Sequence, residues 1–370
     1  MSAQKILFVL QLPPPVHGAS MVNKLIYDSN FINSSFECHY INLTTAKDIN
    51  DIGKGGIKKV IAMFKIWLQV INTFRKHNFD LVYITLSPHG LAFYKDGIMA
   101  ILLKLMGAKV VFHLHGKGIK KQISSNYAHR YLYKLTFKNV KIIHLAPCLY
   151  EDIRMLADKK NVWFVPNGIE PVSTAPTLPK RSNKILYLSN MQESKGSLVL
   201  LKAAKILKER KVDCKIDFVG KWHTNDKFKR EWTAFYESDG LVDMVKYHGP
   251  KYGDAKRTFF EEAALFVLPT FYKNECFPIA ILEAMSYGLP IVSTPEGAIP
   301  DILQNGETGI LTERQNPDEL ADKLQELLEN PDLRSTFALK SMEEFKNKYT
   351  SDIFEKNMVN ALRQIHKAFE

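Results

Sequence analysis

The sequence is poor in several features that define common protein classes. It has four cysteines, Cys38, Cys148, Cys214 and Cys276, which lie far apart and form no CxxC pair. That spacing argues against both a zinc site and a disulfide framework. No run reaches the roughly 18 apolar residues of a membrane-spanning helix. The opening segment MSAQKILFVLQLPPP is typical of a first strand and not of a signal peptide, so we expect a cytoplasmic protein.

Two common phosphate-binding motifs are also missing. The chain contains neither a GxGxxG dinucleotide fingerprint nor a GxxxxGK(S/T) P-loop. Their absence argues against a dehydrogenase and against an NTPase of the P-loop type.

Acidic residues are scarce in the first half of the chain. Residues 1–172 contain 22 lysines and arginines against 10 acids, whereas the remainder contains 28 against 29. Between Lys54 and Lys141, 16 basic residues are balanced only by Asp80 and Asp96. Charge of one sign predicts an anionic partner, for which nucleic acid, an acidic membrane surface and a pyrophosphate-linked lipid all qualify. A solvated basic face without a specific partner is the alternative.

Short apolar runs alternate with helix-like segments along the whole chain, which is typical of repeated βαβ units. We expect strands within residues 5–12, 36–43, 80–87, 109–116, 140–146, 161–168, 184–190, 214–220, 244–249, 264–270, 290–294 and 308–312. Between the two sets of six, PVSTAPTLPKRSN at 171–183 has the composition of a linker.

This pattern predicts an α/β protein with two domains. A chain of 370 residues exceeds what one hydrophobic core usually supports. We expect two Rossmann-like, doubly wound parallel-sheet domains, residues 1–172 and 173–350, facing each other across a cleft. The amphipathic segment 351–370 is expected to cross back onto the first domain.

In doubly wound sheets ligands bind beyond the carboxyl ends of the strands, so the loops there are the candidate sites. In the first loop, PPPVHGAS at 13–20, Gly18 would let the backbone approach a ligand where a helix begins. A proline turn that only reverses the chain would look the same. In FHLHG, His113 and His115 share one strand face. We expect His113 to be structural and His115, at the strand end, to belong to a site.

The second half offers a phosphate-binding candidate in SNMQESKG, residues 189–196. Lys195 and Gly196 stand where the next helix opens, so a phosphate would find backbone donors and a cation together. A solvated lysine at a helix start is the alternative.

The run ECFPIAILEAMSYGLPIVSTPEGAIP, residues 275–300, contains two further carboxylates. Pro278 suits the first helical position, so the N–H groups around Phe277 and Ile279 are expected to point into the same loop as Glu275. Glu283 lies in an otherwise apolar helix, which is expected to be buried. A buried carboxylate needs a hydrogen-bonding partner, from the protein or from a ligand rich in hydroxyl groups.

This run resembles the E-x7-E signature of retaining nucleotide-sugar glycosyltransferases of family 4, which include bacterial surface-polysaccharide enzymes and have the GT-B fold. The FP after the first glutamate, the EAM around the second and the following GLPIV make the resemblance specific. It extends over the chain in the order PPPVHGAS, FHLHG, VPNGIE, SNMQESKG, YHG and LFVLPT.

The resemblance implies a role for each matching residue. Gly18 would abut the donor phosphate and the acceptor, His115 would contact the donor sugar near the reacting centre, and Lys195 would bind the diphosphate. Glu275 would bind hydroxyls of the transferred sugar and Glu283 those of the ribose, which would satisfy its carboxylate. The implied catalytic residues are His115, Lys195 and Glu275, and the implied donor-binding residues are Gly18, Asn190, Lys195, Glu275, Phe277, Pro278, Ile279 and Glu283.

One position departs from the family pattern. Asn190 stands where the family usually has an arginine, five residues before the lysine. Asn190 brings no charge, and Lys221 is the candidate replacement cation.

The implied reaction is sugar transfer with retention of anomeric configuration, from a UDP-sugar more readily than from a GDP-sugar. The resemblance implies no cofactor and no divalent metal ion. In support, the chain has no pair of aspartates spaced D-x-D, the metal-diphosphate motif of the other major glycosyltransferase fold. The expected acceptor is a glycan or lipid-linked saccharide, and residues 55–79 and 117–122 are candidate contacts to an anionic membrane. A GT-B epimerase and a nucleic-acid-binding protein are the alternatives; the second leaves Glu275 and Glu283 unexplained.

Overall fold

The chain forms two compact units in the computed structural model, which describes residues 3–14, 16–44, 57–172, 182–223, 225–238 and 240–370. The first unit is Met1–Gly168 together with Ser351–Glu370, and the second is Ile169–Thr350. The sequence placed this boundary at 172/173. Most of the expected linker at 171–183 lies outside the described residues.

Each of the twelve apolar runs contains one strand, so the prediction of the strands is confirmed. The first unit has β1 Lys5–Leu10, β2 Glu37–Asn42, β3 Leu81–Leu86, β4 Val110–Leu114, β5 Lys141–His144 and β6 Val162–Phe164. The second has β7 Lys184–Leu188, β8 Lys215–Val219, β9 Val245–Tyr247, β10 Leu265–Leu268, β11 Ile291–Ser293 and β12 Gly309–Leu311. Strands β3, β4 and β10 are buried along their whole length, as expected for parallel sheets covered on both faces.

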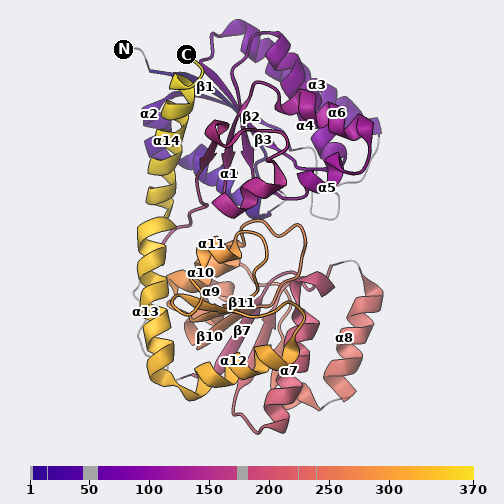
Figure 1. The fold of residues 1–370 in the computed structure, drawn as a ribbon, viewed down its shortest axis with the longest axis vertical. Helices are drawn as coiled ribbons and strands as arrows, with labels where there is room; N and C mark the ends of the chain where they lie inside the picture. The colour runs from indigo at the N-terminus through magenta and orange to yellow at the C-terminus, as the bar shows by residue number, and fades with distance from the viewer. Residues whose placement is uncertain (1–2, 15, 45–56, 173–181, 224, 239) are drawn as a thin grey trace. The chain divides into compact units, whose positions relative to one another are not determined.

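Helices connect these strands (Figure 1). Those of the first unit are α1 Gly18–Asp28, α2 Asn30–Ser35, α3 Ile57–Lys76, α4 Gly90–Leu105, α5 Ile119–Ile123, α6 Tyr127–Phe137 and α14 Ser351–Lys367. Those of the second are α7 Ser197–Glu209, α8 Asp226–Ser238, α9 Asp254–Glu262, α10 Ile279–Ser286, α11 Ile299–Ile302, α12 Pro317–Glu329 and α13 Pro331–Lys348. Short 3-10 helices add Pro147–Asp152, Lys159–Asn161, Glu193–Lys195 and Leu241–Asp243.

Both sheets are doubly wound. The first has the strand order β2-β1-β3-β4-β5-β6 and the second β12-β11-β10-β7-β8-β9, and all the strand pairs are parallel. The direction of winding reverses between β1 and β3 in the first sheet and between β7 and β10 in the second. Ligands of such sheets bind beyond the carboxyl ends of the strands at these reversal points.

The helices of the first unit form two layers. Because crossover connections are right-handed, the steps β2 to β3, β3 to β4 and β4 to β5 put α3, α4 and α6 on one face of the sheet. The step from β1 to β2 runs the other way and puts α1 and α2 on the opposite face. Accordingly α3 contacts α4 and α4 contacts α6, while α2 contacts α14 (Figure 1).

The last helix belongs to the first unit, as the sequence predicted. In α14, Phe354, Met358 and Leu362 are buried, and the Trp163 indole N–H donates to the Gln364 side chain at 3.0 Å. Among the described helices, including α14, we find none that combines the length and the apolar composition needed to cross a bilayer.

Candidate functional site

A polar site of the second unit lies at the reversal point of its sheet. The loop after β7 carries Lys195 and the loop after β10 carries Glu275. Because β7 and β10 are neighbouring parallel strands, both loops leave the same edge of the sheet side by side. Topology therefore brings together two residues that are 80 positions apart in the sequence.

A glycine allows these two loops to approach closely. Gly196 has a φ of 80°, in the left-handed region, and a Cβ at this position would lie 2.0 Å from the Pro269 carbonyl oxygen. The residue must therefore be glycine. Backbone contact continues at Phe271, whose N–H donates to the Ser194 carbonyl at 2.8 Å.

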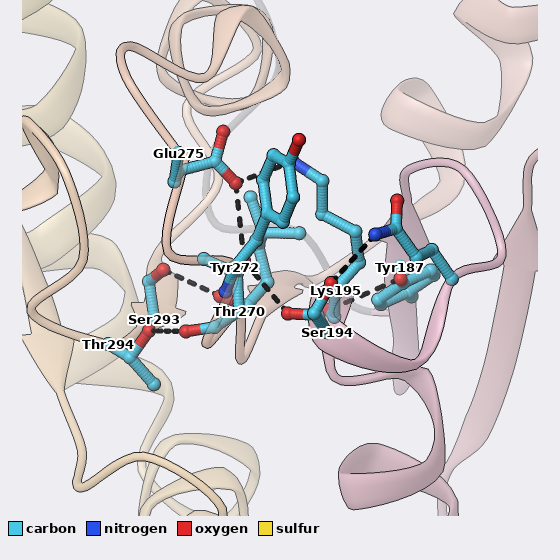
Figure 2. Close-up of polar contacts among 10 residues, drawn as sticks. Tyr187, Ser194, Lys195, Thr270, Tyr272, Glu275, Ser293 and Thr294 are labelled. Atoms are coloured by element: carbon cyan, nitrogen blue, oxygen red, sulfur yellow. Dashed lines mark hydrogen bonds and ion pairs between the residues drawn. The ribbon is translucent and has the colours of Figure 1, made fainter. Parts of the chain in front are cut away.

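Lys195 and Glu275 form an ion pair across this junction (Figure 2). The ammonium nitrogen lies 2.6 Å from Oε2, and the two side chains are only 16% and 8% exposed. The same ammonium lies 4.8 Å from the centre of the Tyr272 ring, within cation–π distance. Burial strengthens the attraction between the charges, but it also makes each charge dependent on the other.

Among the described residues, the Glu275 carboxylate is bound through one of its two oxygens. Oε2 accepts from Lys195 and, at 3.2 Å, from the Thr270 hydroxyl. No hydrogen bond from a described residue reaches Oε1, and Figure 2 shows this oxygen pointing away from Lys195. An ammonium has three donors and a carboxylate several acceptor positions, so both groups keep capacity for a ligand.

The loop that carries Glu275 is fixed by the chain after β11. The Thr294 hydroxyl donates to the Thr270 carbonyl, and the Ser293 hydroxyl donates to the Leu268 carbonyl at 2.6 Å (Figure 2). Gly297, with a φ of 57°, would place a Cβ 2.4 Å from the Glu275 carbonyl oxygen. The carboxylate is thus anchored from both sides of its loop.

The start of α10 differs by one position from the expectation. Pro278 caps the helix with φ −72° and ψ 109°, and Ile279 is the first helical residue. The prediction that Pro278 occupies the first helical position is therefore wrong, because its extended ψ keeps it outside the helix. The first N–H groups of α10 still lack intrahelical acceptors. Phe277 is buried, with its ring edge-on to Tyr349 at 6.1 Å between ring centres.

Helix α10 is largely buried, as the sequence predicts, but the side chain of Glu283 is only partly buried. Its side chain is 21% exposed and pairs with the ammonium of Lys256 on α9. The buried side of α10 is formed by neighbours such as Leu282 and Met285. A protein partner therefore satisfies one oxygen of Glu283, and no ribose is needed to explain the carboxylate.

Asn190 and Lys221 follow the adjacent strands β7 and β8. Both residues are exposed. The Met191 N–H donates to the Lys221 carbonyl at 2.8 Å, which holds the two loops together. Lys221 thus leaves the same sheet edge as Asn190.

In the first unit, Gly18 is the first residue of α1 at the reversal point of the first sheet. The preceding His17 caps the helix, because its Nδ1 accepts from the Ser20 N–H at 3.3 Å. Asn23 fixes α1 to the sheet by donating to the Gln11 carbonyl at 3.1 Å. Gly18 is exposed at this edge.

His115 follows β4 and is itself half-buried, beside the fully buried His113. Its ring is 4.0 Å from that of His113, and both of its nitrogens are buried without a hydrogen-bond partner among the described residues. His113 is fully buried and hydrogen-bonded to the Tyr83 hydroxyl, as its structural assignment predicts. His144 on β5 is also buried, and its Nδ1 accepts from the Leu145 N–H at 2.9 Å.

Burial keeps these rings neutral. Desolvation, with the charge of His144 and then of His17 adding to it, lowers the pKa of His115 to about 3. Desolvation alone lowers the pKa of His144 to about 3, and desolvation lowers the pKa of His113 well below its usual value. Two neutral nitrogens on His115 can offer one donor and one acceptor to a ligand. No group of three or more histidine, cysteine or acidic side chains in the described ranges could hold a metal ion.

Several residues around Glu275 were not expected from the sequence. Thr270, Tyr272 and Thr294 support the carboxylate or the lysine, and Lys256 pairs with Glu283. The sequence could have indicated Thr270, because it directly follows the apolar run of β10. No sequence pattern indicates Lys256, since it lies 27 residues before its partner on a charged helix.

One segment of the second unit is similar to a known protein family. Residues 169–343 match the family model described as glycosyl transferases group 1. Residues 169–343, called the group 1 segment below, make up just under half of the chain and contain Lys195, Glu275 and Glu283.

Individual relatives align over part of the chain. The D-inositol 3-phosphate glycosyltransferase of Paenarthrobacter aurescens is 28% identical over 190 residues, covering 48% of this chain and 46% of that protein. The amylovoran biosynthesis glycosyltransferase AmsK of Erwinia amylovora is 27% identical over 229 residues, covering 59% and 55%. The chain thus spans about half the length of these curated relatives.

Similarity of fold extends over nearly the whole chain, beyond the part that aligns in sequence. Anabaena HepE, solved in complex with UDP-glucose, superposes with a TM-score of 0.73 over 97% of this chain and 99% of that one, at 16% identity. The two six-stranded parallel sheets are those of GT-B glycosyltransferase structures, so the predicted fold class is confirmed.

The buried histidines predict acid sensitivity of the first unit. The pKa values of these histidines in the folded chain lie below the ordinary value of 6.5. As the pH falls through 6.5, the unfolded chain therefore binds more protons than the folded chain, and this difference favours unfolding. Between about pH 7.5 and about pH 5.5 the free energy of unfolding should fall by about 1.4 kcal/mol for each histidine that stays neutral. Chemical denaturation at the two pH values measures the loss.

His144→Asn provides the matched test of that loss. Asparagine keeps an acceptor near the Leu145 N–H but does not titrate, so this variant should lose less stability between the two pH values. His223→Gln removes an exposed histidine and is the control. Equal losses in wild type and His144→Asn would contradict the assignment.

Proposed function

We propose that this chain is a glycosyltransferase that moves a sugar from a nucleotide diphosphate sugar to a hydroxyl group of a glycan or lipid-linked acceptor. The observation that carries the proposal is the Lys195–Glu275 ion pair, because it lies at the ligand-binding edge of the second sheet, inside the group 1 segment. The cation can donate further hydrogen bonds to the diphosphate of such a donor, and the carboxylate can accept further hydrogen bonds from the hydroxyl groups of its sugar.

Lys195 binds the donor diphosphate in this proposal. Two of its three N–H donors are not used by Glu275, so it can donate to phosphate oxygens without leaving the carboxylate. The N–H groups at the start of α10, near Phe277, Pro278 and Ile279, supply further donors. A UDP-sugar is the proposed donor class, supported by the fold similarity to HepE, which was solved with UDP-glucose.

Glu275 positions the transferred sugar. Its Oε1 accepts from sugar hydroxyls, while Oε2 stays on Lys195 and Thr270. The bond from the anomeric carbon to the diphosphate breaks as the acceptor hydroxyl attacks from the same face, and the departing phosphate takes the hydroxyl proton. The product retains the anomeric configuration, and stabilisation of the departing negative charge by Lys195 replaces a metal ion.

The roles of Glu283, Asn190, Gly18 and His115 remain predictions from the family resemblance, and Lys221 remains the candidate replacement cation. Glu283 would bind the ribose through the oxygen that Lys256 leaves unused, and Asn190 would face the diphosphate, with Lys221 as the additional cation. Gly18 and His115 would act from the first unit, His115 as a neutral imidazole.

The first unit would bind the acceptor. Its excess of basic residues suits a pyrophosphate-linked saccharide, and the relative AmsK acts in synthesis of the polysaccharide amylovoran. We propose that the protein acts in cell-surface polysaccharide synthesis, at the cytoplasmic face of an anionic membrane.

Slow hydrolysis of a panel of UDP- and GDP-sugars, without acceptor, tests the activity. We expect one UDP-sugar to be hydrolysed in the presence of a metal chelator. The sugar should be released first as the same anomer that the donor carried, which proton NMR detects before mutarotation. Release of the opposite anomer, or hydrolysis only with added divalent ions, would contradict retention or metal independence respectively.

Lys195→Met should weaken UDP binding by about tenfold to a hundredfold, since a charge-assisted hydrogen bond contributes about 1.5 to 3 kcal/mol. Titration calorimetry with UDP measures the effect. The matched control is Lys202→Met, which removes the same charge from an exposed position on α7 of the same unit. Unchanged UDP affinity in Lys195→Met would remove this lysine from the donor site.

A further inference from the structure

Exposed apolar side chains are concentrated on one helix layer of the first unit. Of the seventeen large hydrophobic side chains that are exposed among the described residues, nine lie on α3, α4 and α6. They are Ile61, Phe64 and Leu68 on α3, Leu91, Ile98 and Leu105 on α4, and Tyr127, Tyr131 and Leu135 on α6. We call this set the α3–α4–α6 face. The described residues of the second unit include three exposed side chains of this kind, Val242, Tyr252 and Leu339.

The spacing on each helix makes a continuous stripe. Tyr127, Tyr131 and Leu135 are four residues apart on α6, and Leu91, Ile98 and Leu105 are seven apart on α4. Both spacings return a side chain to the same side of a helix. Tyr127 is 88% exposed and Leu105 is 80% exposed, so these residues are not packed at the edge of the core.

The three helices present their stripes in one direction. They cover the same face of the first sheet, where Val70, Met99 and Phe137 enter the hydrophobic core. The sides opposite to these residues therefore face outward together (Figure 1). The Lys104 ammonium fastens α4 to α6 by donating to the carbonyls of Leu135, Thr136 and Lys138, each at 2.8 Å.

Basic residues are interleaved with these stripes. Lys65 lies between Phe64 and Leu68, while Arg130 and Lys134 lie beside Tyr131. Helices α3, α4, α5 and α6 contain a single acid, Asp96, which is fully buried and accepts from the Ser87 N–H. The face therefore combines exposed apolar groups with positive charge and presents no exposed carboxylate from these helices.

We propose that the α3–α4–α6 face docks on an anionic lipid bilayer, with its tyrosines and aliphatic side chains in the headgroup region and its lysines and arginines on lipid phosphates. Amphipathic surfaces bind membranes through this combination of apolar burial and attraction to anionic lipids. A protein partner fits less well, because the centres of protein interfaces are depleted of lysine. A second copy of the chain would oppose positive charge to positive charge.

This docking deepens the proposed function by naming the lipid surface that would hold a lipid-linked acceptor, and it can be measured without any sugar transfer. Sedimentation with vesicles of phosphatidylcholine alone, and of equal parts phosphatidylcholine and phosphatidylglycerol, is measured at low and high salt. The chain should sediment with the anionic vesicles only, and high salt should weaken the binding. Failure here leaves donor hydrolysis unaffected, so the two proposals fail separately.

Two double variants locate the binding on this face. Arg130→Gln with Lys134→Gln should weaken vesicle binding by about tenfold or more, because each basic group near an anionic membrane contributes about 1 kcal/mol. Tyr127→Ser with Tyr131→Ser should weaken it while leaving the charge unchanged. The control, Lys202→Gln with Lys227→Gln, removes the same charge from exposed positions of the second unit and should bind as wild type does.

Three results would overturn the proposal. The first is a wild-type chain that ignores anionic vesicles at low salt. The second is a control variant that loses as much binding as Arg130→Gln with Lys134→Gln, which would make net charge the only cause. The third is a dimer in solution that dissociates when Tyr127 and Tyr131 are replaced, without any vesicle binding, which would assign the face to a second copy. Circular dichroism checks that each variant is folded.

Discussion

The buried ion pair between Lys195 and Glu275 is the constraint on which the second unit's site depends. Neither charge has a full shell of water, so each is tolerated because the other is 2.6 Å away. Keeping them at that distance requires Gly196 against Pro269 and the hydroxyl contacts around Thr270. The pair is also incomplete, since Oε1 of Glu275 and two donors of Lys195 remain for a ligand. A site that is rigid yet unsaturated is suited to holding a donor in one orientation.

Sheet topology explains why the site forms where it does. Reversal of the winding between β7 and β10 leaves a gap between helices at the carboxyl edge, and the two loops that enter it carry the charged pair. The first sheet has its own reversal point between β1 and β3, next to the loop of Gly18. The histidines after β4 and on β5 extend that edge, and their low pKa values keep it neutral within a basic unit.

The sequence predicted the fold in more detail than the site. Parallel strands buried on both faces appear as continuous apolar runs, so all twelve strands could be read directly. Lys195 and Glu275 could each be identified as loop residues, but their contact could not, because it depends on which strands are neighbours. Glu283 was misjudged for the same reason. Its partner Lys256 comes from another helix, and composition alone does not tell which side of α10 faces solvent. The α3–α4–α6 face likewise emerged only once three helices were known to share a layer.

The division of labour between Lys195 and Glu275 can be tested most directly with Glu275→Gln. If the lysine serves the diphosphate and the glutamate serves the sugar, removal of the negative charge frees the ammonium. Titration calorimetry should then show UDP affinity that is unchanged or higher than in wild type, while turnover of the UDP-sugar falls by about a hundredfold or more. A fall in UDP affinity as large as that of Lys195→Met, or undiminished turnover, would contradict the account.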